Sequence, residues 1–291
     1  FKPGEPDLIC DIWTEISRNL AAEFDANGWP ASPEEFMAAR EAMDYRVMER
    51  MRDRVESIVT DQATAEALKP WFRFLCKRPL SNNDYYPTFN RPGVKLLDVS
   101  DTQGVEALTE KGFMHKGKEY EVDCIIFASG FEVTSDLERR WGIDVVEGRD
   151  GRSIYDHWRE GPLTLHSTMT HGFPNQFYIG YIQGAANGSV TLQFGEQGRH
   201  IAYIISEALN RGAKEVEPTA EAMNAYVDRF HELELDLSAF QAECTPSYFN
   251  NEGEKNTRWA LFRSWGLGWD NFGEMIESWR KDGKLEGLHL S

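Results

Sequence analysis

The sequence predicts an α/β protein whose front lobe is mainly helical. Over residues 10–69, apolar side chains recur at the three- to four-residue spacing of amphipathic helices. Beyond Pro70, short apolar runs bounded by Gly, Pro and Asn are typical of strands. Two further helical stretches follow in the second half of the chain. Strands that alternate with helices indicate the α/β class.

Two long helices are expected in the front lobe. Apolar residues lie four apart over residues 12–24, and Gly28 is a suitable helix end. Ser32 and Glu35 form a capping box around Pro33, which holds the favoured first helical position. We interpret the apolar stripe of the second helix as core packing rather than a ligand site. Its members are Phe36, Met43, Val47, Met51, Val55 and Ile58.

Short strands are expected at 94–99 and 177–180. A hairpin-like stretch begins at 105–109, with Gly112 and Gly117 in its turns.

The second half of the chain is expected to carry two helices. A loop of small residues, 183–189, leads into the first helix, which stops at Gly212. The second helix covers about residues 218–235 and has its apolar side chains on one face.

The most informative segment is 123–131, which reads Asp-Cys-Ile-Ile-Phe-Ala-Ser-Gly-Phe. An acidic residue before four apolar ones predicts a buried parallel strand. The small residues after them let the backbone pass close to a flat or phosphorylated group. Flavoproteins with two dinucleotide-binding domains carry such a segment late in their chains, and a Gly-x-Gly-x-x-Gly loop opens each domain. This sequence contains no such loop, so we expect the second half of a larger enzyme.

The composition is that of a globular protein, because 41% of the 291 residues are hydrophobic. A net charge of −17 argues against a nucleic-acid partner, which needs clustered Lys and Arg. No apolar run has the length of a membrane span, and the cysteines form no closely spaced framework. We therefore expect a cytoplasmic protein. The histidines lack metal-ligand spacing, so no metal site is expected.

Lys77 and Arg78 precede a proline and then a polar, aromatic loop at 82–87. A compact Lys charge suits a phosphate, and a planar Arg suits a flat or bidentate anion. Taken alone, a solvated basic dipeptide is the simpler interpretation.

Two other segments have balanced interpretations. The loop 185–189 precedes a helix and suits an oxygen-rich ligand, although an ordinary helix entry explains it equally well. The segment 171–175, His-Gly-Phe-Pro-Asn, could hold a polar His near a site, but a turn is the favoured interpretation.

Six segments together resemble the C-terminal half of type I Baeyer–Villiger monooxygenases, particularly the longer enzymes that act on large cyclic or steroidal ketones. Each segment is moderately specific, and all six occur in the order of the family along nearly the whole chain. They are 13–20, 76–79, 84–92, 123–131, 171–175 and 246–250.

The resemblance implies FAD and NADPH as cofactors. In this family, reduced flavin reacts with O2 to give a peroxyflavin, whose distal oxygen attacks a ketone and yields an ester or lactone. Arg78 is similar to the active-site arginine that stabilises the negatively charged peroxyflavin, as a permanent cation beside a developing anion can. Lys77 resembles a contact to the NADPH 2′-phosphate. Tyr248 stands where the family often has a Trp that contacts the nicotinamide cofactor.

The remaining candidate residues also follow from the resemblance. Ala186, Asn187 and Gly188 are expected to face the flavin and the substrate, and Tyr85 and Tyr86 to face the substrate. Ser129 replaces the usual Thr of its segment and keeps a hydroxyl. The flavoprotein segment that is expected to contact cofactor comprises Ala128, Ser129, Gly130 and Phe131.

On the family layout, residues 1–69 are a helical insertion of the NADPH domain. Residues 70–131 complete that domain, and 132–291 form the C-terminal part of the FAD domain. The family fingerprint, both Gly-rich loops and the Asp that pairs with the active-site Arg are absent from this sequence. We therefore expect a partner, the N-terminal half of the same enzyme, from the same gene or a separate chain. Alone, this chain is expected to bind FAD poorly and to be inactive.

Two alternatives remain open from the sequence. One is another class B flavin monooxygenase that oxidises nitrogen or sulfur, although the Lys-Arg-Pro segment and the aromatic loop behind it argue against that class. The other is a non-catalytic remnant that kept the fold and lost the chemistry. Retention of Lys77, Arg78 and Asn187 together favours a working enzyme.

Overall fold

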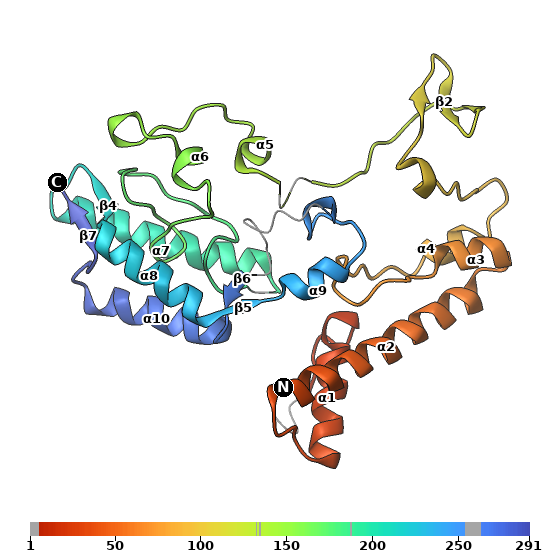
Figure 1. Cartoon of the computed structure of the whole chain (residues 1–291), viewed down its shortest axis with the longest axis horizontal. Coiled ribbons are helices and arrows are strands. Elements are labelled where there is room, and N and C mark those ends of the chain that lie inside the picture. Colours follow the sequence, from red (N-terminus) through yellow and green to blue (C-terminus); the bar gives the residue numbers. More distant parts are fainter. Residues whose placement is uncertain (1–5, 132, 134, 187, 254–262) are drawn as a thin grey trace. The chain divides into compact units, whose positions relative to one another are not determined.

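The computed structural model describes residues 6–131, 133, 135–186, 188–253 and 263–291 (Figure 1). The chain divides into two compact units, Phe1–Gly130 and Phe131–Ser291. Helices dominate both units, and the sheets are small. No helix within these described residues is long and apolar enough to cross a membrane.

The first unit is built on the two predicted helices, α1 (Ile12–Asn27) and α2 (Pro33–Ile58). The side chain of Ser32 accepts the N–H of Glu35, as the capping box predicts, whereas the Glu35 carboxylate accepts the N–H of Ala31, one residue before the expected N–H of Ser32. Two shorter helices follow, α3 (Gln62–Leu68) and α4 (Tyr85–Thr88). The core between α1, α2 and the segment after α3 consists of Ile16, Leu20, Phe24, Met43, Val47, Met48 and Phe74.

The predicted hairpin is present as an antiparallel sheet. Its strands are β1 (Ala107–Leu108), β2 (Gly112–His115) and β3 (Lys118–Glu121), in the order β1-β2-β3. Lys116 and Gly117 have φ values of 47° and 71°, as the two-residue turn between β2 and β3 requires. A Cβ on Gly112 would lie 1.9 Å from the carbonyl oxygen of Tyr120, so only glycine fits this place in β2.

The predicted strand at 123–131 is wrong for this structure. The segment is extended, but it forms no ladder with any described residue, and its side chains are exposed. Ile126 is 84% exposed and Phe127 75% exposed. A parallel strand needs neighbours to accept and donate its backbone hydrogen bonds, and the described residues place none beside it. The predicted strand at 94–99 is extended without a partner for the same reason.

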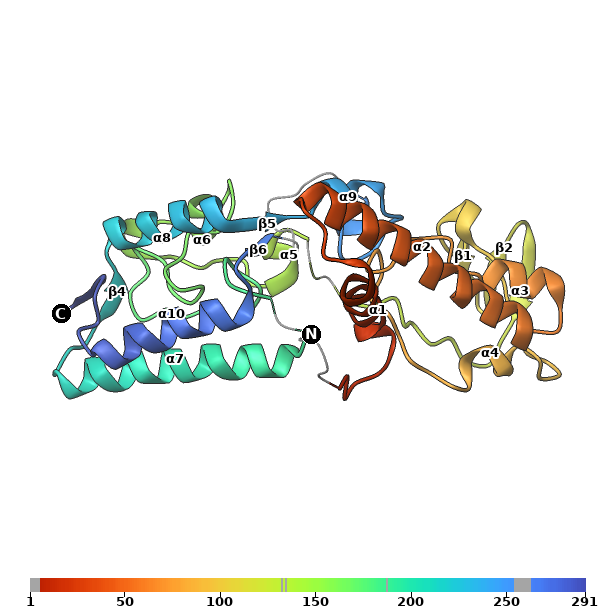
Figure 2. The ribbon, with the colours of Figure 1, turned by 90° about the horizontal axis from the view of Figure 1, so that it is seen from below.

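The second unit contains the two predicted long helices, α7 (Val190–Asn210) and α8 (Ala220–Leu233). A third, α10 (Gly268–Asp282), lies beside α7 (Figures 1 and 2). Antiparallel pairs join β4 (Val216–Pro218) to β7 (Leu288–Leu290) and β5 (Glu234–Asp236) to β6 (Arg263–Trp265). The short helices are α5 (Leu137–Trp141), α6 (Ile154–His157) and α9 (Ser238–Glu243), and the single 3-10 turns of both units are Ser100–Thr102, Arg149–Gly151 and Asn251–Gly253.

The predicted strand at 177–180 is not formed. A backbone carbonyl and one side chain pair with its backbone groups in place of a neighbouring strand. The N–H of Tyr178 donates to the carbonyl of Thr168 at 2.8 Å. The side-chain amide of Gln197, on α7, accepts from the N–H of Gly180 at 3.1 Å and donates to its carbonyl at 2.9 Å. A buried amide has both a donor and an acceptor, so it can satisfy a backbone group that a sheet would otherwise pair.

Two histidines meet in the core of the second unit. His166 Nδ1 lies 3.3 Å from His200 Nε2, and the ring of Trp279 contacts both imidazoles edge-on. Burial lowers the pKa of His166 to about 4. Burial, the neighbouring His166 and Arg280 lower the pKa of His200 to about 3. Both rings are therefore neutral at pH 7, where one donates a proton to the other in their shared hydrogen bond.

We predict that acid destabilises the second unit through this histidine pair. In the unfolded chain both rings bind protons below about pH 6.5, whereas the folded rings stay neutral to about pH 4. The free energy of unfolding should therefore fall between pH 7 and pH 4, by up to about 1.4 kcal/mol per pH unit for each histidine. Urea unfolding monitored by tryptophan fluorescence measures this slope. His200→Gln should flatten it, whereas His289→Gln, at an exposed site, should not. Equal slopes in all three proteins would contradict the assignment.

Candidate cofactor and substrate site

The predicted cations Lys77 and Arg78 lie over aromatic rings of the first unit. The guanidinium of Arg78 is 5.9 Å from the centre of the Trp13 ring, and the ammonium of Lys77 is 5.7 Å from the Phe72 ring. Arg78 is exposed, and Lys77 is half-buried. Such contacts orient a cation. The fold thus brings together 13–20 and 76–79, which are far apart in sequence.

The two predicted substrate tyrosines have different surroundings. Tyr85 is 53% exposed and meets the rings of Tyr86 and Phe89 edge-on, with centroids 5.4 Å and 5.3 Å away. Tyr86 packs against the apolar cluster of Val55, Val59 and Ala65, and burial raises its pKa. Tyr85 therefore offers a free ring face, whereas Tyr86 mainly anchors α4 to α2. Their role toward a substrate stays a prediction.

The loop 183–189 of the second unit, which is predicted to face the flavin, is anchored by the buried residue Gln183. The side-chain oxygen of Gln183 accepts the N–H and the hydroxyl of Thr164, both at 2.8 Å, and its carbonyl accepts the hydroxyl of Tyr226. Ala185 is 2% exposed and belongs to the core. Ala186 and Gly188 are exposed just before the N-terminus of α7.

This arrangement suits an oxygen-rich group, because the first N–H groups of a long helix have no intrahelical acceptor and small residues admit a ligand to them. The predicted residue Asn187 lies outside the described residues.

Tyr248 lies on a tight loop that Asn250 organises. The side-chain oxygen of Asn250 accepts the N–H of Ser247 at 2.8 Å and that of Gly253 at 3.1 Å. Tyr248 is half-buried and its ring centre is 4.5 Å from that of Phe249. The loop therefore fixes the backbone on both sides of this aromatic residue. Contact with a nicotinamide cofactor stays a prediction.

The predicted residues 128–131 are extended and exposed, and Gly130 has a φ of 95° that favours glycine. Arg78, Lys77, Tyr85, Tyr86 and 128–130 belong to the first unit. Phe131, Ala186, Gly188 and Tyr248 belong to the second.

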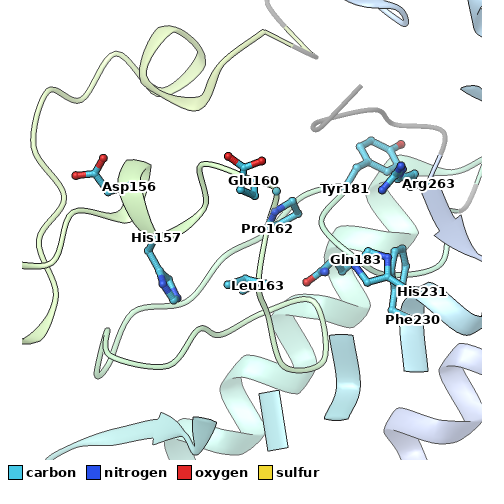
Figure 3. Close-up of a pocket in the computed structure, with 11 residues that line it drawn as sticks. Asp156, His157, Glu160, Pro162, Leu163, Tyr181, Gln183, Phe230, His231 and Arg263 are labelled. Atoms are coloured by element: carbon cyan, nitrogen blue, oxygen red, sulfur yellow. The ribbon is translucent and has the colours of Figure 1, made fainter. Parts of the chain in front are cut away.

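The second unit also contains a pocket of about 280 Å³ that the sequence did not indicate (Figure 3). Its side chains come from α6, the loop around Pro162, the end of α8 and the start of β6. Burial lowers the pKa of His157 to about 4, so that its imidazole is neutral at pH 7. Sequence patterns did not indicate the pocket because its walls come from segments that are far apart in the chain, from Asp156 to Arg263. Its labelled lining residues are Asp156, His157, Glu160, Pro162, Leu163, Tyr181, Gln183, Phe230, His231 and Arg263.

The segment 171–175 is a structural turn, as the sequence favoured. His171 Nδ1 lies 2.9 Å from the carbonyl of Pro218, and the N–H of Gly172 donates to the buried carboxylate of Glu217 at 2.9 Å. The Asn175 side chain accepts the N–H of Val216 and donates to the carbonyl of Lys214. These bonds join the turn to β4, so His171 serves the fold.

No group of three or more acidic, histidine or cysteine side chains that could hold a metal ion is found among the described residues.

The sequence matches no known family model. Curated relatives include a pentalenolactone D synthase of Streptomyces arenae, 39% identical over 291 residues, which cover 99% of this chain and 49% of the relative. Another is the Baeyer-Villiger monooxygenase ATR8 of Stachybotrys chlorohalonatus, 40% identical, with 98% of this chain and 45% of the relative covered. The chain spans about half the length of the curated relatives it matches.

Solved structures give a similar result. The polycyclic ketone monooxygenase of the fungus Thermothelomyces thermophila superposes with a TM-score of 0.80 at 29% identity, over 100% of this chain and 48% of that one. A structure of OTEMO in complex with FAD and NADP has a TM-score of 0.66 at 26% identity, over 86% of this chain and 45% of that one.

We predict that Glu217 stabilises the turn at 171–175. Glu217→Ala leaves the buried N–H of Gly172 without an acceptor, which should lower the free energy of unfolding by about 1–3 kcal/mol. The matched control is Glu215→Ala, which removes the exposed partner of the same Arg149 and should have a smaller effect. Urea unfolding curves measure both. Equal losses in the two variants would mean that Glu217 acts only through Arg149.

Proposed function

The chain belongs with the Baeyer–Villiger monooxygenases and corresponds to their C-terminal half, and on that premise we propose its activity. It is the C-terminal part of an enzyme, dependent on FAD and NADPH, that inserts one oxygen atom of O2 into a ketone to give an ester or lactone. The observation that carries this proposal is the match of nearly the whole chain to such enzymes at up to 40% identity.

Arg78 is the proposed catalytic residue. Its guanidinium is exposed and lies over the ring of Trp13. This cation–π contact helps to orient its N–H donors. The bound flavin would supply the activation of O2. Arg78 would hold the negative charge that develops there, since a guanidinium stays protonated in any protein site.

The remaining candidate residues would bind the cofactors. Lys77, a flexible point charge beside Arg78, suits a phosphate of NADPH. The N-terminal end of α7, with the small exposed residues Ala186 and Gly188, fits a flat group that carries oxygen atoms. Asn187, Tyr248 and 128–131 complete this proposed set, and the domain limits at 69 and 131 are proposed with it.

A bulky or cyclic ketone is the proposed substrate. Its support is the solved relative from Thermothelomyces thermophila, a polycyclic ketone monooxygenase, which matches the whole chain. Half-exposed Tyr85 offers an aromatic ring for such a molecule.

The proposed partner is the N-terminal half of the same enzyme. Ile126, Phe127 and Phe131 are between 75% and 89% exposed, which is costly for apolar side chains that follow one another in an extended segment. Their backbone also has no ladder partner among the residues that the structure describes. Both features support a sheet that residues of the N-terminal half complete.

We predict that Arg78→Ala in the complete enzyme lowers ester formation by at least about a hundredfold, as loss of a charge-stabilising donor does. Reduction of the flavin by NADPH should slow far less, because the proposed role of Arg78 lies in the later step, in which O2 is activated. Product analysis and stopped-flow absorbance measure the two steps. Arg54→Ala, at an exposed site of α2, is the matched control. Unchanged ester formation would remove Arg78 from the mechanism.

We predict that this polypeptide binds FAD tightly only with the N-terminal half. Co-expression of the two halves should yield a complex with a stoichiometric flavin spectrum, and this chain alone should show none. Phe127→Asp should prevent the complex, because it would bury a charge in the completed sheet. Leu108→Asp, at an exposed site of β1, should not. Stoichiometric flavin on the isolated chain would contradict the proposal.

A further inference from the structure

A buried carboxylate lies in the helical core of the first unit. Asp44, in the middle of α2, is 3% exposed, and its neighbours in the apolar core are Met43 and Val47. An ionised carboxylate in such surroundings is costly unless charged and hydrogen-bonding partners compensate it. The groups that hydrogen-bond and pair with Asp44 must therefore compensate the cost of burying its carboxylate.

Both described partners of Asp44 belong to the segment that leads to Arg78. Asp44 Oδ1 accepts the backbone N–H of Phe74 at 2.9 Å, and Oδ2 lies 3.3 Å from Nε of Arg73. Arg73 also forms an ion pair with Glu41, one turn earlier on α2, at 3.1 Å. A single helix thus holds this segment through its backbone and through a charged side chain.

The segment held in this way is a strained turn. Leu75 has a φ of 67°, in the left-handed region that a branched side chain rarely adopts. The N–H of Cys76 closes the turn on the carbonyl of Arg73 at 3.1 Å. Phe74 is 8% exposed and packs into the core between α1 and α2. Such a backbone conformation persists only where the surrounding structure enforces it.

Lys77 and Arg78 leave this turn directly. Their side chains point over Phe72 and over Trp13 of α1, so their direction depends on the path of the backbone at 73–76. A shift of about 1 Å in a catalytic group can cost about a hundredfold in rate.

We propose that Asp44 is a positioning residue for Lys77 and Arg78. It fixes the turn at 73–76 through the N–H of Phe74 and the guanidinium of Arg73. The path of the backbone in this turn then determines where the side chain of Arg78 lies relative to the reacting centre. This inference rests on the proposed function, because it assigns Asp44 a role only through Arg78 and Lys77.

The test uses the complete enzyme with Asp44→Asn and Asp44→Ala. Asn keeps an acceptor for the N–H of Phe74 and loses the charge that holds Arg73, whereas Ala loses both. Ester formation should fall by about tenfold to a hundredfold in Asp44→Ala and by less in Asp44→Asn. The KM for NADPH should rise, and more hydrogen peroxide should form per NADPH consumed. Asp53→Ala, exposed on the same helix, should change none of these.

A double-mutant cycle separates positioning from a loss of stability. If Asp44 acts through Arg78, Asp44→Ala combined with Arg78→Ala should form ester no more slowly than Arg78→Ala alone. Losses that multiply, or variants with normal KM and coupling but less folded protein, would overturn the inference. Asp44→Asn keeps the test valid if Asp44→Ala does not fold.

The two proposals fail differently. If the complete enzyme forms no ester or lactone from ketones, the proposed function is wrong. If it forms ester and Arg78→Ala leaves the rate unchanged, the proposed role of Arg78 is wrong, and with it that of Asp44. If Arg78→Ala abolishes ester formation and both Asp44 variants keep normal kinetics, only the role of Asp44 is wrong.

Discussion

Hydrogen bonds from buried polar side chains to the backbone hold the irregular segments of this chain in place. An extended or turning backbone must find partners for its N–H and C=O groups, and a neighbouring strand is the usual source. Here Asp44 supplies an acceptor to the turn before Arg78, Gln197 pairs Gly180, and Glu217 pairs Gly172. Because these side chains are buried, the bonds are stronger than they would be in water, and losing one leaves a costly unpaired group.

In this arrangement the residues that hold the backbone differ from the residues that are proposed to contact a ligand. In the loop before α7 the residues that hold the backbone are buried, and the residue proposed to meet a ligand is next to them and exposed. Gln183 and Ala185 lie beneath Ala186, and Asn250 folds the loop that carries Tyr248. Rigid support beside an exposed group is what a binding site needs, since a ligand then spends little free energy on ordering the protein.

Local patterns predicted α1, α2, α7, α8 and the hairpin correctly, but they did not indicate α10. The capping box at Ser32, the glycine end at Gly28 and the four-residue apolar spacing all act within one or two helical turns. The hairpin was predictable because its turn at Lys116 and Gly117 specifies the pairing of the strands that flank it. The strands predicted at 94–99, 123–131 and 177–180 are not formed among the described residues, because a strand exists only where another strand pairs with it, and apolar content does not say whether one does.

The sequence by itself determined the family resemblance, the helical lobe and the identity of the candidate residues, because these depend on residue types and short spacings. Only the tertiary structure decided that Trp13 lies under Arg78, that Asp44 holds the turn at 73–76, and that His171 serves the fold. These relations join residues that are thirty or more positions apart. They form because buried polar groups must find hydrogen-bond partners and apolar side chains must pack, and both do so against distant segments. A local sequence pattern contains no information on those partners.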